Sequence, residues 1–264
     1  MNILINDFRM SYEDVGQGRP VILIHGYPLN RAIWAPQIQE LSSRYRLITP
    51  DLRGHGDSEA TPGPYTMDLL ADDIAGLIQA LQIRQPVILG GLSMGGYVAM
   101  AFARRYPEWL AGLLLAATRA DADTEAGKEN RRKAVAAAQE ACSNEPAIQS
   151  MLPKLLAPRT YPENPVLVEE VRKIIEKTSL AGVINAQLGM IARPDSHETL
   201  RNLQVPGLMI YGDQDQIIPG EAAVQTGSSF VYGVIAEIRG AGHLLNMEQA
   251  GEFNRILGEW LDHF

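Results

Sequence analysis

The segment with the most structural information reads Val87-Ile88-Leu89-Gly90-Gly91-Leu92-Ser93-Met94-Gly95-Gly96-Tyr97-Val98-Ala99. A short apolar run typical of a buried strand precedes the serine, and a helical stretch follows it. A serine hydroxyl is a weak nucleophile at neutral pH, so a catalytic serine needs a turn that holds it where a base can reach it. Gly91 and Gly95 remove Cβ atoms that would collide with the neighbouring strand and helix. The segment therefore predicts a nucleophile elbow with Ser93 at its tip.

The chain around this elbow alternates short apolar runs with helical segments up to about residue 118. The periodicity predicts helices at residues 31–41 and 67–81. Such alternation is typical of a mostly parallel sheet, here of about eight strands, flanked by helices in an α/β fold. The first two strands are expected to form an antiparallel pair. The strands are expected at residues 3–5, 9–13, 21–24, 45–50, 86–89 and 110–117.

The composition changes at about residue 120, where Ala, Glu, Lys and Arg become frequent and no strand is expected before residue 205. The sheet resumes at residues 207–211 and 231–238, and a helix at 247–261 ends the chain. These patterns predict a core domain of residues 1–119 and 201–264, interrupted by a helical cap at 120–200. The cap helices are expected at residues 124–142, 148–156, 166–177 and 180–191, separated by Pro146, Pro153, Pro158, Pro162 and Pro165.

Composition and charge exclude several classes of function. The 264 residues are 46% hydrophobic and carry a formal net charge of -8, which disfavours a nucleic-acid partner. No run approaches the roughly 18 apolar residues of a membrane helix, and the first residues lack a basic start. Cys142 is the single cysteine and cannot form an internal disulfide, so a reducing, cytoplasmic location is expected. We expect a monomer or homodimer without a cofactor or metal.

Five histidines are candidates for the base that a nucleophilic serine requires. His243 follows the last strand and precedes the last helix, so it is expected on a loop at the same sheet edge as the elbow. His25 and His55 are expected to hold their loops by hydrogen bonds. His197 and His263 are expected in solvent, in the cap and at the chain end. His243 is therefore the candidate base.

The acid that orients this base is expected after a strand and before His243. Asp215 is the candidate, because it follows the strand at 207–211 in the stretch Gly212-Asp213-Gln214-Asp215. Asp213 remains an alternative in the same turn. Asp121 and Asp123, after the sixth strand, occupy a second position from which an acid can reach the base.

Two backbone N-H groups are candidates to stabilise the oxyanion that forms during acyl transfer. Met94 lies at the N-terminus of the helix after the elbow, where the helix dipole also favours negative charge. Tyr27 lies in the loop after the third strand, in His25-Gly26-Tyr27-Pro28. Pro28 favours an extended backbone at Tyr27, which would hold that donor in place.

Taken together, these motifs resemble the α/β-hydrolase superfamily, and within it the small serine carboxylesterases, lactonases and cofactor-free haloperoxidases. By this resemblance Ser93, Asp215 and His243 form the catalytic triad, and the insertion is the cap that covers the pocket. Epoxide hydrolases and haloalkane dehalogenases of the superfamily use an aspartate where this chain has Ser93. The resemblance rests on residues 25–28, 51–58, 91–96, 212–219 and 240–243.

The resemblance implies hydrolysis of carboxylic esters with small to medium acyl chains. Lactones, such as acyl-homoserine lactones or enol-lactones, are an alternative substrate class. A perhydrolase or haloperoxidase-like activity, and a receptor-like role with slow turnover, are further alternatives. Candidate substrate-binding residues can equally belong to the packing of the cap or of a helix. These candidates are Tyr27, Trp34, Leu152, Leu156 and Leu188.

Overall fold

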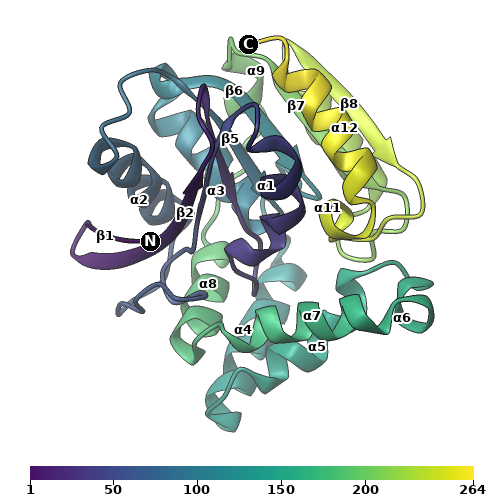
Figure 1. Ribbon diagram of the computed structural model, residues 1–264. Coiled ribbons are helices and arrows are strands. Elements are labelled where there is room, and N and C mark those ends of the chain that lie inside the picture. The colour runs from purple at the N-terminus through teal and green to yellow at the C-terminus, as the bar shows by residue number, and fades with distance from the viewer.

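The computed structural model describes residues 1–264, which form one eight-stranded sheet with helices on both faces (Figure 1). The strand order is β1-β2-β4-β3-β5-β6-β7-β8. Strand β2 is antiparallel to β1 and β4, and all other pairs are parallel. The predicted fold class is therefore confirmed. The strands are β1 (Asn2–Ile5), β2 (Phe8–Val15), β3 (Pro20–Ile24), β4 (Arg46–Pro50), β5 (Val87–Leu92), β6 (Leu110–Ala116), β7 (Gly207–Gly212) and β8 (Gly233–Ile238).

The central strands are buried on both faces, which explains why their sequences are continuous apolar runs. Every residue of β3 and β5 is buried. Successive side chains point to opposite faces of the sheet. Ile22 and Ile24 therefore join the hydrophobic core on one face, whereas Val21 and Leu23 join the core on the other.

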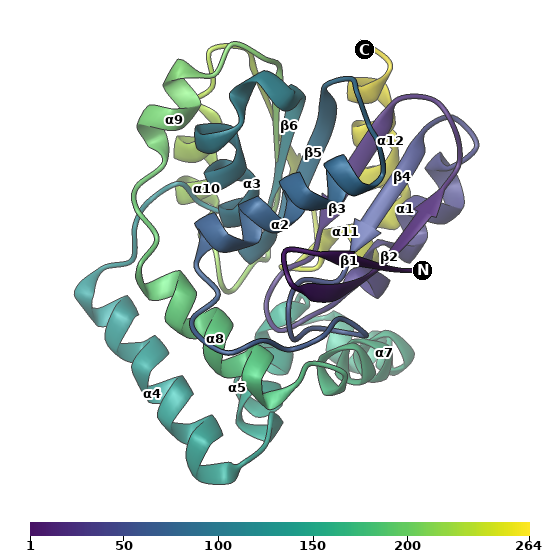
Figure 2. The same ribbon diagram turned by 90° about the vertical axis from the view of Figure 1, so that its left-hand side faces the viewer.

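Helices cover both faces of the sheet (Figure 2). The residues of each layer contribute to the hydrophobic core on their own side of the sheet. One layer contains α2 (Met67–Ala80), α3 (Met94–Arg105), α9 (His197–Asn202) and α10 (Gly220–Gly227). The other contains the 3-10 helix η1 (Arg31–Trp34), α1 (Ala35–Leu41), α11 (Leu245–Glu248) and α12 (Ala250–Leu261). A second 3-10 helix, η2 (Pro107–Trp109), precedes β6. No helix is both long enough and apolar enough to cross a membrane.

Between β6 and helix α9 the chain forms five helices, which we call the helical insertion. They are α4 (Glu125–Ala141), α5 (Glu145–Leu155), α6 (Thr160–Glu163), α7 (Pro165–Glu176) and α8 (Leu180–Ile191). Both views place α4, α5, α7 and α8 together at one end of the sheet (Figures 1 and 2). The division into a core of residues 1–119 and 201–264 and a cap of 120–200 stays a prediction.

The expectation that Pro153 separates two helices is wrong, because Pro153 lies inside α5. Pro153 cannot donate a hydrogen bond to the carbonyl four residues earlier, but only two residues of the helix follow it. The Tyr161 hydroxyl also bridges the last turn, because it donates to Leu152 O at 2.5 Å and accepts from Leu156 N at 3.1 Å. Pro146 lies in the first turn of the same helix, where a missing N-H has no cost.

Three short helices, α6, α9 and α10, are absent from the sequence-based expectations, and the last expected helix is divided into α11 and α12. Helices of four to eight residues show too few turns for an apolar periodicity to stand out. Their positions depend on tertiary contacts instead.

Candidate active site

Ser93 occupies a strained turn between β5 and α3. Its backbone has φ 55° and ψ -114°, a combination rarely adopted by residues with a side chain. Two hydrogen bonds hold it there, from Ser93 N to Ala116 O at 2.9 Å and from Thr118 Oγ1 to Ser93 O at 2.8 Å. Between Val87 and Ala103, Ser93 alone is not buried. The turn therefore presents this one side chain outside the surrounding core.

The glycines around Ser93 allow the elbow to pack against its neighbours. A Cβ on Gly91 would lie 2.1 Å from Gly95 O, and one on Gly95 would lie 2.3 Å from Ile24 O. A Cβ on Gly26 would lie 3.1 Å from the Cβ of Ser93. The loop after β3 therefore lies directly beside the serine.

Replacing Gly95 by alanine is expected to lower the free energy of unfolding by about 1–3 kcal/mol, the usual cost of overpacking. The added methyl group would meet the backbone of Ile24, which cannot rotate away. Gly251→Ala is the matched control, because a Cβ there meets no atom within 4 Å. Urea unfolding of both variants measures the effect, and equal midpoints would show that the elbow tolerates the extra atom.

Asp215 and His243 form a buried pair. Asp215 Oδ2 lies 2.8 Å from His243 Nδ1, and both side chains are 1% exposed. Asp215 Oδ1 accepts hydrogen bonds from Ile217 N at 2.8 Å and Ile218 N at 3.0 Å. An ionised carboxylate only accepts, so His243 Nδ1 is the donor and Nε2 of the neutral ring carries a lone pair. That Nε2 atom is buried and has no hydrogen-bond partner within the protein.

Backbone contacts bring the loops that carry these residues to one edge of the sheet. Ser93 follows β5, which pairs with β6. Directly after β6, Ala117 N donates a hydrogen bond to Ile210 O of β7. The acid loop after β7 contacts the histidine loop after β8, because Gln214 N donates to Ala241 O at 2.9 Å. The structure thus joins Asp215 to His243 and places Ser93 at the carboxyl end of β5, on the same edge.

The alternative acids have other partners. Asp213 is exposed and accepts a hydrogen bond from Gly240 N at 2.6 Å. Asp123 is buried and pairs with three arginines of the chain segments around it, Arg119, Arg131 and Arg193. Neither carboxylate has a hydrogen bond to a histidine. Asp121 lies near His197 instead, with 3.5 Å between Asp121 Oδ1 and His197 Nε2.

Hydrogen bonds of the His25 side chain hold the loop that carries Tyr27. His25 Nε2 accepts from Leu52 N at 2.9 Å, and Nδ1 lies 2.9 Å from Gly26 O. The Tyr27 side chain is buried, which raises the pKa of its phenol to about 12. Met94 is the first residue of α3, so its N-H has no acceptor within the helix. Both predicted oxyanion donors therefore lie on segments that border Ser93.

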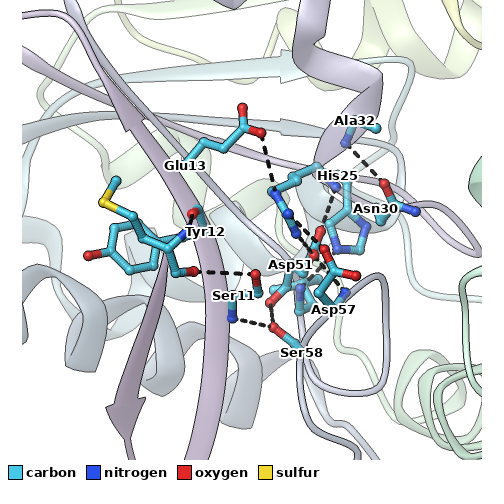
Figure 3. Close-up of polar contacts among 12 residues, drawn as sticks. Ser11, Tyr12, Glu13, His25, Asn30, Ala32, Asp51, Asp57 and Ser58 are labelled. Carbon is cyan, nitrogen blue, oxygen red and sulfur yellow. Dashed lines mark hydrogen bonds and ion pairs between the residues drawn. The ribbon is translucent and has the colours of Figure 1, made fainter.

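Asp51 anchors the neighbouring loop, as Figure 3 shows. Asp51 Oδ1 accepts from Arg31 N at 2.7 Å, Oδ2 accepts from Asp57 N at 2.9 Å, and the carboxylate also pairs with the Arg31 guanidinium. Ser58 Oγ donates to Asp51 O at 2.7 Å and accepts from Ser11 N at 2.8 Å. This cluster ties the loop after β4 to both β2 and η1. It thereby supports the loop between β3 and η1 that carries Tyr27.

His25 and His55 are both fully buried, with 5.1 Å between their ring centroids. His55 Nδ1 lies 2.8 Å from Arg53 O. The expectation that the two histidines hold their loops by hydrogen bonds is confirmed. Burial lowers the pKa of His25 to about 4 and the pKa of His55 to about 3, from an ordinary value of 6.5.

The free energy of unfolding is expected to fall as the pH decreases below about 6.5, because the unfolded chain then binds protons that the buried rings of the native state do not. Each histidine contributes up to about 1.4 kcal/mol per pH unit until its folded pKa is reached. His55→Asn should remove one such contribution, because an asparagine side chain does not titrate. Its amide can still donate to Arg53 O, as His55 Nδ1 does. Urea unfolding between pH 7.5 and 5 measures the slope. His263→Asn, at the exposed chain end, is the control; identical slopes in all three proteins would contradict the assignment.

The candidate substrate-binding residues lie in different surroundings. Trp34 is fully buried against Phe253, with ring centroids 6.1 Å apart, a position that favours helix packing. Leu156 is buried, whereas Leu152 and Leu188 are partly exposed. Their role as lining residues stays a prediction.

The end of α5 contacts both loops of the buried pair. Gln216, next to Asp215, donates from Nε2 to Leu156 O at 3.2 Å. Leu244, next to His243, donates from its backbone N-H to Leu155 O at 2.8 Å. The helical insertion is therefore attached directly to the loops that position the acid and the base.

Glu248 is a residue of this region that sequence reasoning missed. Its carboxylate accepts from Gly242 N at 2.6 Å, from Ala157 N at 2.7 Å and from Thr160 Oγ1 at 2.6 Å. It thus connects the histidine loop to the helical insertion. Nothing in the sequence distinguishes Glu248 from an ordinary acidic residue on a surface helix.

The expectation that His197 lies in solvent is wrong. The residue is buried, and its Nδ1 lies 2.7 Å from Ser229 Oγ, a contact between segments 32 residues apart. His263 is exposed, as expected.

A mostly parallel eight-stranded sheet with a serine on a strained strand-to-helix turn is the architecture of an α/β hydrolase. The chain belongs to the alpha/beta hydrolase family, whose sequence model matches residues 21–256.

Solved structures and curated relatives agree with this assignment. A thermophilic esterase from Thermogutta terrifontis, solved with malate bound, is 39% identical with a TM-score of 0.95; the match covers 100% of this chain and 98% of the esterase. The enol-lactonase from Burkholderia xenovorans LB400 is 25% identical with a TM-score of 0.91, over 99% of this chain and 100% of that one. The 3-oxoadipate enol-lactonase 2 of Acinetobacter baylyi is 27% identical over 98% of this chain and 95% of its own. The protein is an enzyme of the α/β-hydrolase type.

Proposed function

We propose that the protein is a serine hydrolase that cleaves carboxylic esters with small to medium acyl chains, with Ser93 as nucleophile, His243 as base and Asp215 as the acid that orients the base. The observation that supports this most strongly is the buried contact of 2.8 Å between Asp215 Oδ2 and His243 Nδ1. It leaves the lone pair of His243 Nε2 free of any partner within the protein. That atom is available to accept the proton of the Ser93 hydroxyl.

In the first step of the proposed reaction, Ser93 Oγ attacks the ester carbonyl carbon while its proton passes to His243 Nε2. The carbonyl oxygen becomes an oxyanion. The backbone N-H groups of Tyr27 and Met94 donate to it. The imidazolium that forms is stabilised by Asp215, which accepts from Nδ1. His243 then gives the proton to the departing alkoxide, and the acyl group stays on Ser93.

In the second step, a water molecule loses a proton to His243 and attacks the acyl-enzyme. The bond to Ser93 Oγ then breaks, His243 returns the proton to that oxygen, and the acid is released. The attachment of α5 to the loops of Asp215 and His243 gives the helical insertion a direct influence on this step. The proposed chemistry uses only groups of the protein and water, so it needs neither a metal nor a cofactor.

Similarity to an esterase and to enol-lactonases supports an ester-like substrate. A lactone is a cyclic ester, so the same steps would open its ring and give a single product that carries both the acid and the alcohol. The enol-lactonase relatives make lactones the second candidate substrate class. The apolar side chains of Leu152, Leu156 and Leu188 fit an acyl group better than a charged one.

Hydrolysis of p-nitrophenyl esters from acetate to decanoate, measured beside an acyl-homoserine lactone and an enol-lactone, tests this proposal. Turnover that is greatest for short or medium chains and is lost in Ser93→Ala is the expected result. Faster opening of a lactone than of any linear ester would favour the second substrate class. Turnover that survives in Ser93→Ala would contradict the proposed nucleophile.

The same samples distinguish the two remaining alternatives. A single burst of nitrophenol without further turnover would favour the receptor-like role, because the acyl-enzyme would then accumulate. Halogenation that depends on peroxide and is lost in Ser93→Ala would favour the perhydrolase. The esterase proposal predicts steady turnover and no such dependence.

A further inference from the structure

The chain enters the helical insertion through residues 120–123, the outward passage, and leaves it through residues 193–197, the return passage. The two passages lie against each other. Ser196 N on the return passage donates to Ala120 O on the outward one at 2.9 Å. Arg193 Nη2 and Asp123 Oδ1 add an ion pair of 2.9 Å between the same passages. This region lies outside the proposed catalytic residues, and here the backbone connects the helical insertion to the strands of the sheet.

Three possible metal ligands meet at this crossing. One ligand atom each from Asp121, Asp195 and His197 lies within 4.8 Å of the other two. Asp121 comes from the outward passage, and the other two come from the return passage. Acidic residues alone are common on protein surfaces. Whether this cluster can bind a metal ion therefore depends on the burial and the hydrogen bonds of His197.

The hydrogen bonds of Ser229 favour a tautomer of His197 with the proton on Nδ1. The His197 side chain is 9% exposed, and Nδ1 lies 2.7 Å from Ser229 Oγ. The Ser229 hydroxyl donates its own hydrogen to Gln225 O at 3.2 Å, so it accepts from His197 Nδ1. In the neutral ring, Nε2 then carries a lone pair. Nε2 is buried, has no hydrogen-bond partner and faces Asp121.

The distance between His197 Nε2 and Asp121 Oδ1 fits a shared cation better than a direct hydrogen bond. At 3.5 Å it exceeds the usual length of an N-H to oxygen bond. Two electron pairs at this separation repel each other unless a positive charge lies between them. Ligands about 2.1 Å from a tetrahedral Zn²⁺ ion are about 3.4 Å apart.

We propose that Asp121, Asp195 and His197 form a binding site for Zn²⁺, completed by water. Zinc suits this donor set, because it prefers nitrogen and carboxylate ligands in tetrahedral geometry, whereas Ca²⁺ and Mg²⁺ prefer oxygen alone. Asp195 Oδ1 accepts from His197 N at 3.0 Å, which leaves its second oxygen to bind the ion. Ser229 is a positioning residue, because its contact with Nδ1 aims Nε2 at the ion, as the outer partners of metal-bound histidines do.

The ion would join the outward and return passages of the chain. Because it binds ligands from both passages in the folded protein, it stabilises the native state over the unfolded one. It would also limit movement of the helical insertion relative to the sheet. The proposed ester hydrolysis does not use these residues, so its rate is not the primary measure of zinc binding.

Titration of the chelator-treated protein with ZnCl₂ in a calorimeter tests the site. We expect one saturable Zn²⁺ per chain for the wild type, and at least ~10-fold weaker binding in His197→Asn and Asp121→Asn, because even loss of an outer partner of a metal ligand costs about 10- to 100-fold in affinity. Asparagine at 197 can keep the hydrogen bond to Ser229 while it lacks an atom in place of Nε2. His263→Asn removes an exposed histidine and should bind as the wild type does.

Two further measurements protect this test from a folding artefact. Bound Co²⁺ should give the strong visible absorption of a tetrahedral site in the wild type and lose it in His197→Asn. Zn²⁺ should raise the melting temperature of the wild type but not of His197→Asn, whose far-UV circular dichroism should match the wild type. Asp121→Asn serves as the second variant, because its side chain is 38% exposed and tolerates exchange.

The proposal is overturned by binding that His197→Asn retains, because the ion would then bind elsewhere. It is also overturned if the wild type shows no saturable binding.

Discussion

Exchange of Ser93 for alanine is expected to lower kcat by a factor on the order of 10⁶, if the three proposed catalytic residues act as one unit, as they do in subtilisin. The reason is that only Ser93 Oγ can form the acyl-enzyme, so the variant must rely on direct attack by water. Alanine removes this one atom and leaves the hydrogen bonds of the Ser93 backbone to Ala116 and Thr118 intact. Steady-state hydrolysis of the preferred p-nitrophenyl ester measures the loss.

The control for this variant is Ser228→Ala. Ser228 is exposed, and its hydroxyl donates to the backbone of Val224. Its exchange should leave kcat and KM unchanged. A decrease of less than about 10³-fold for Ser93→Ala would place the nucleophile elsewhere, since triad variants in well-studied serine hydrolases lose more.

Exchange of Asp215 for asparagine is expected to lower kcat by a factor on the order of 10⁴, the loss known from the same change in a serine protease. The structure explains why the effect should be so large. Ile217 N and Ile218 N both donate to Oδ1, so an asparagine keeps its oxygen there and turns its NH₂ group toward His243 Nδ1. Nδ1 must then accept, which moves the ring proton to Nε2. A protonated Nε2 cannot take the proton of Ser93.

Asp213→Asn is the matched control, because Asp213 lies two residues away and its carboxylate accepts from Gly240 N rather than from a histidine. Its kcat should stay within a few-fold of the wild type. Nitrogen-15 NMR of His243 should show the proton on Nδ1 in the wild type and on Nε2 in Asp215→Asn. Equal losses in both aspartate variants would indicate a general effect on the loop rather than on the tautomer.

The sheet could be predicted from the sequence because its central strands are buried on both faces. Continuous apolar runs such as β3 and β5 stand out from the helices, and a glycine-rich turn marks the end of β5. The path of α5 through Pro153 could not be predicted, because the Tyr161 hydroxyl that bridges its last turn comes from the next helix. The short helices depend on such contacts as well.

The candidate site could be predicted as far as it follows chain order. The segments with Ser93, Asp215 and His243 each come directly after a strand, and parallel strands end at a common edge. Contacts between segments distant in the sequence left no such pattern. The three hydrogen bonds of Glu248 join the histidine loop to the helical insertion, and the burial of His197 depends on Ser229. Both residues look like ordinary surface residues in the sequence.

The attachment of α5 to the acid and histidine loops also relates the two proposals. If the helical insertion moves when substrate enters, the bonds from Gln216 to Leu156 and from Leu244 to Leu155 must adjust. Zinc at Asp121, Asp195 and His197 would restrain the other end of the insertion. A higher KM in the presence of Zn²⁺, absent in His197→Asn, would then indicate that substrate entry requires this movement.

The central claim is that Ser93 is a nucleophile activated by His243. Its most direct test is mass spectrometry of the intact protein after reaction with a fluorophosphonate, followed by peptide mapping. We predict a single adduct per chain on Ser93, absent from Ser93→Ala and formed much more slowly in His243→Ala. An adduct on another residue, or an unlabelled Ser93 in a protein that still hydrolyses esters, would contradict it.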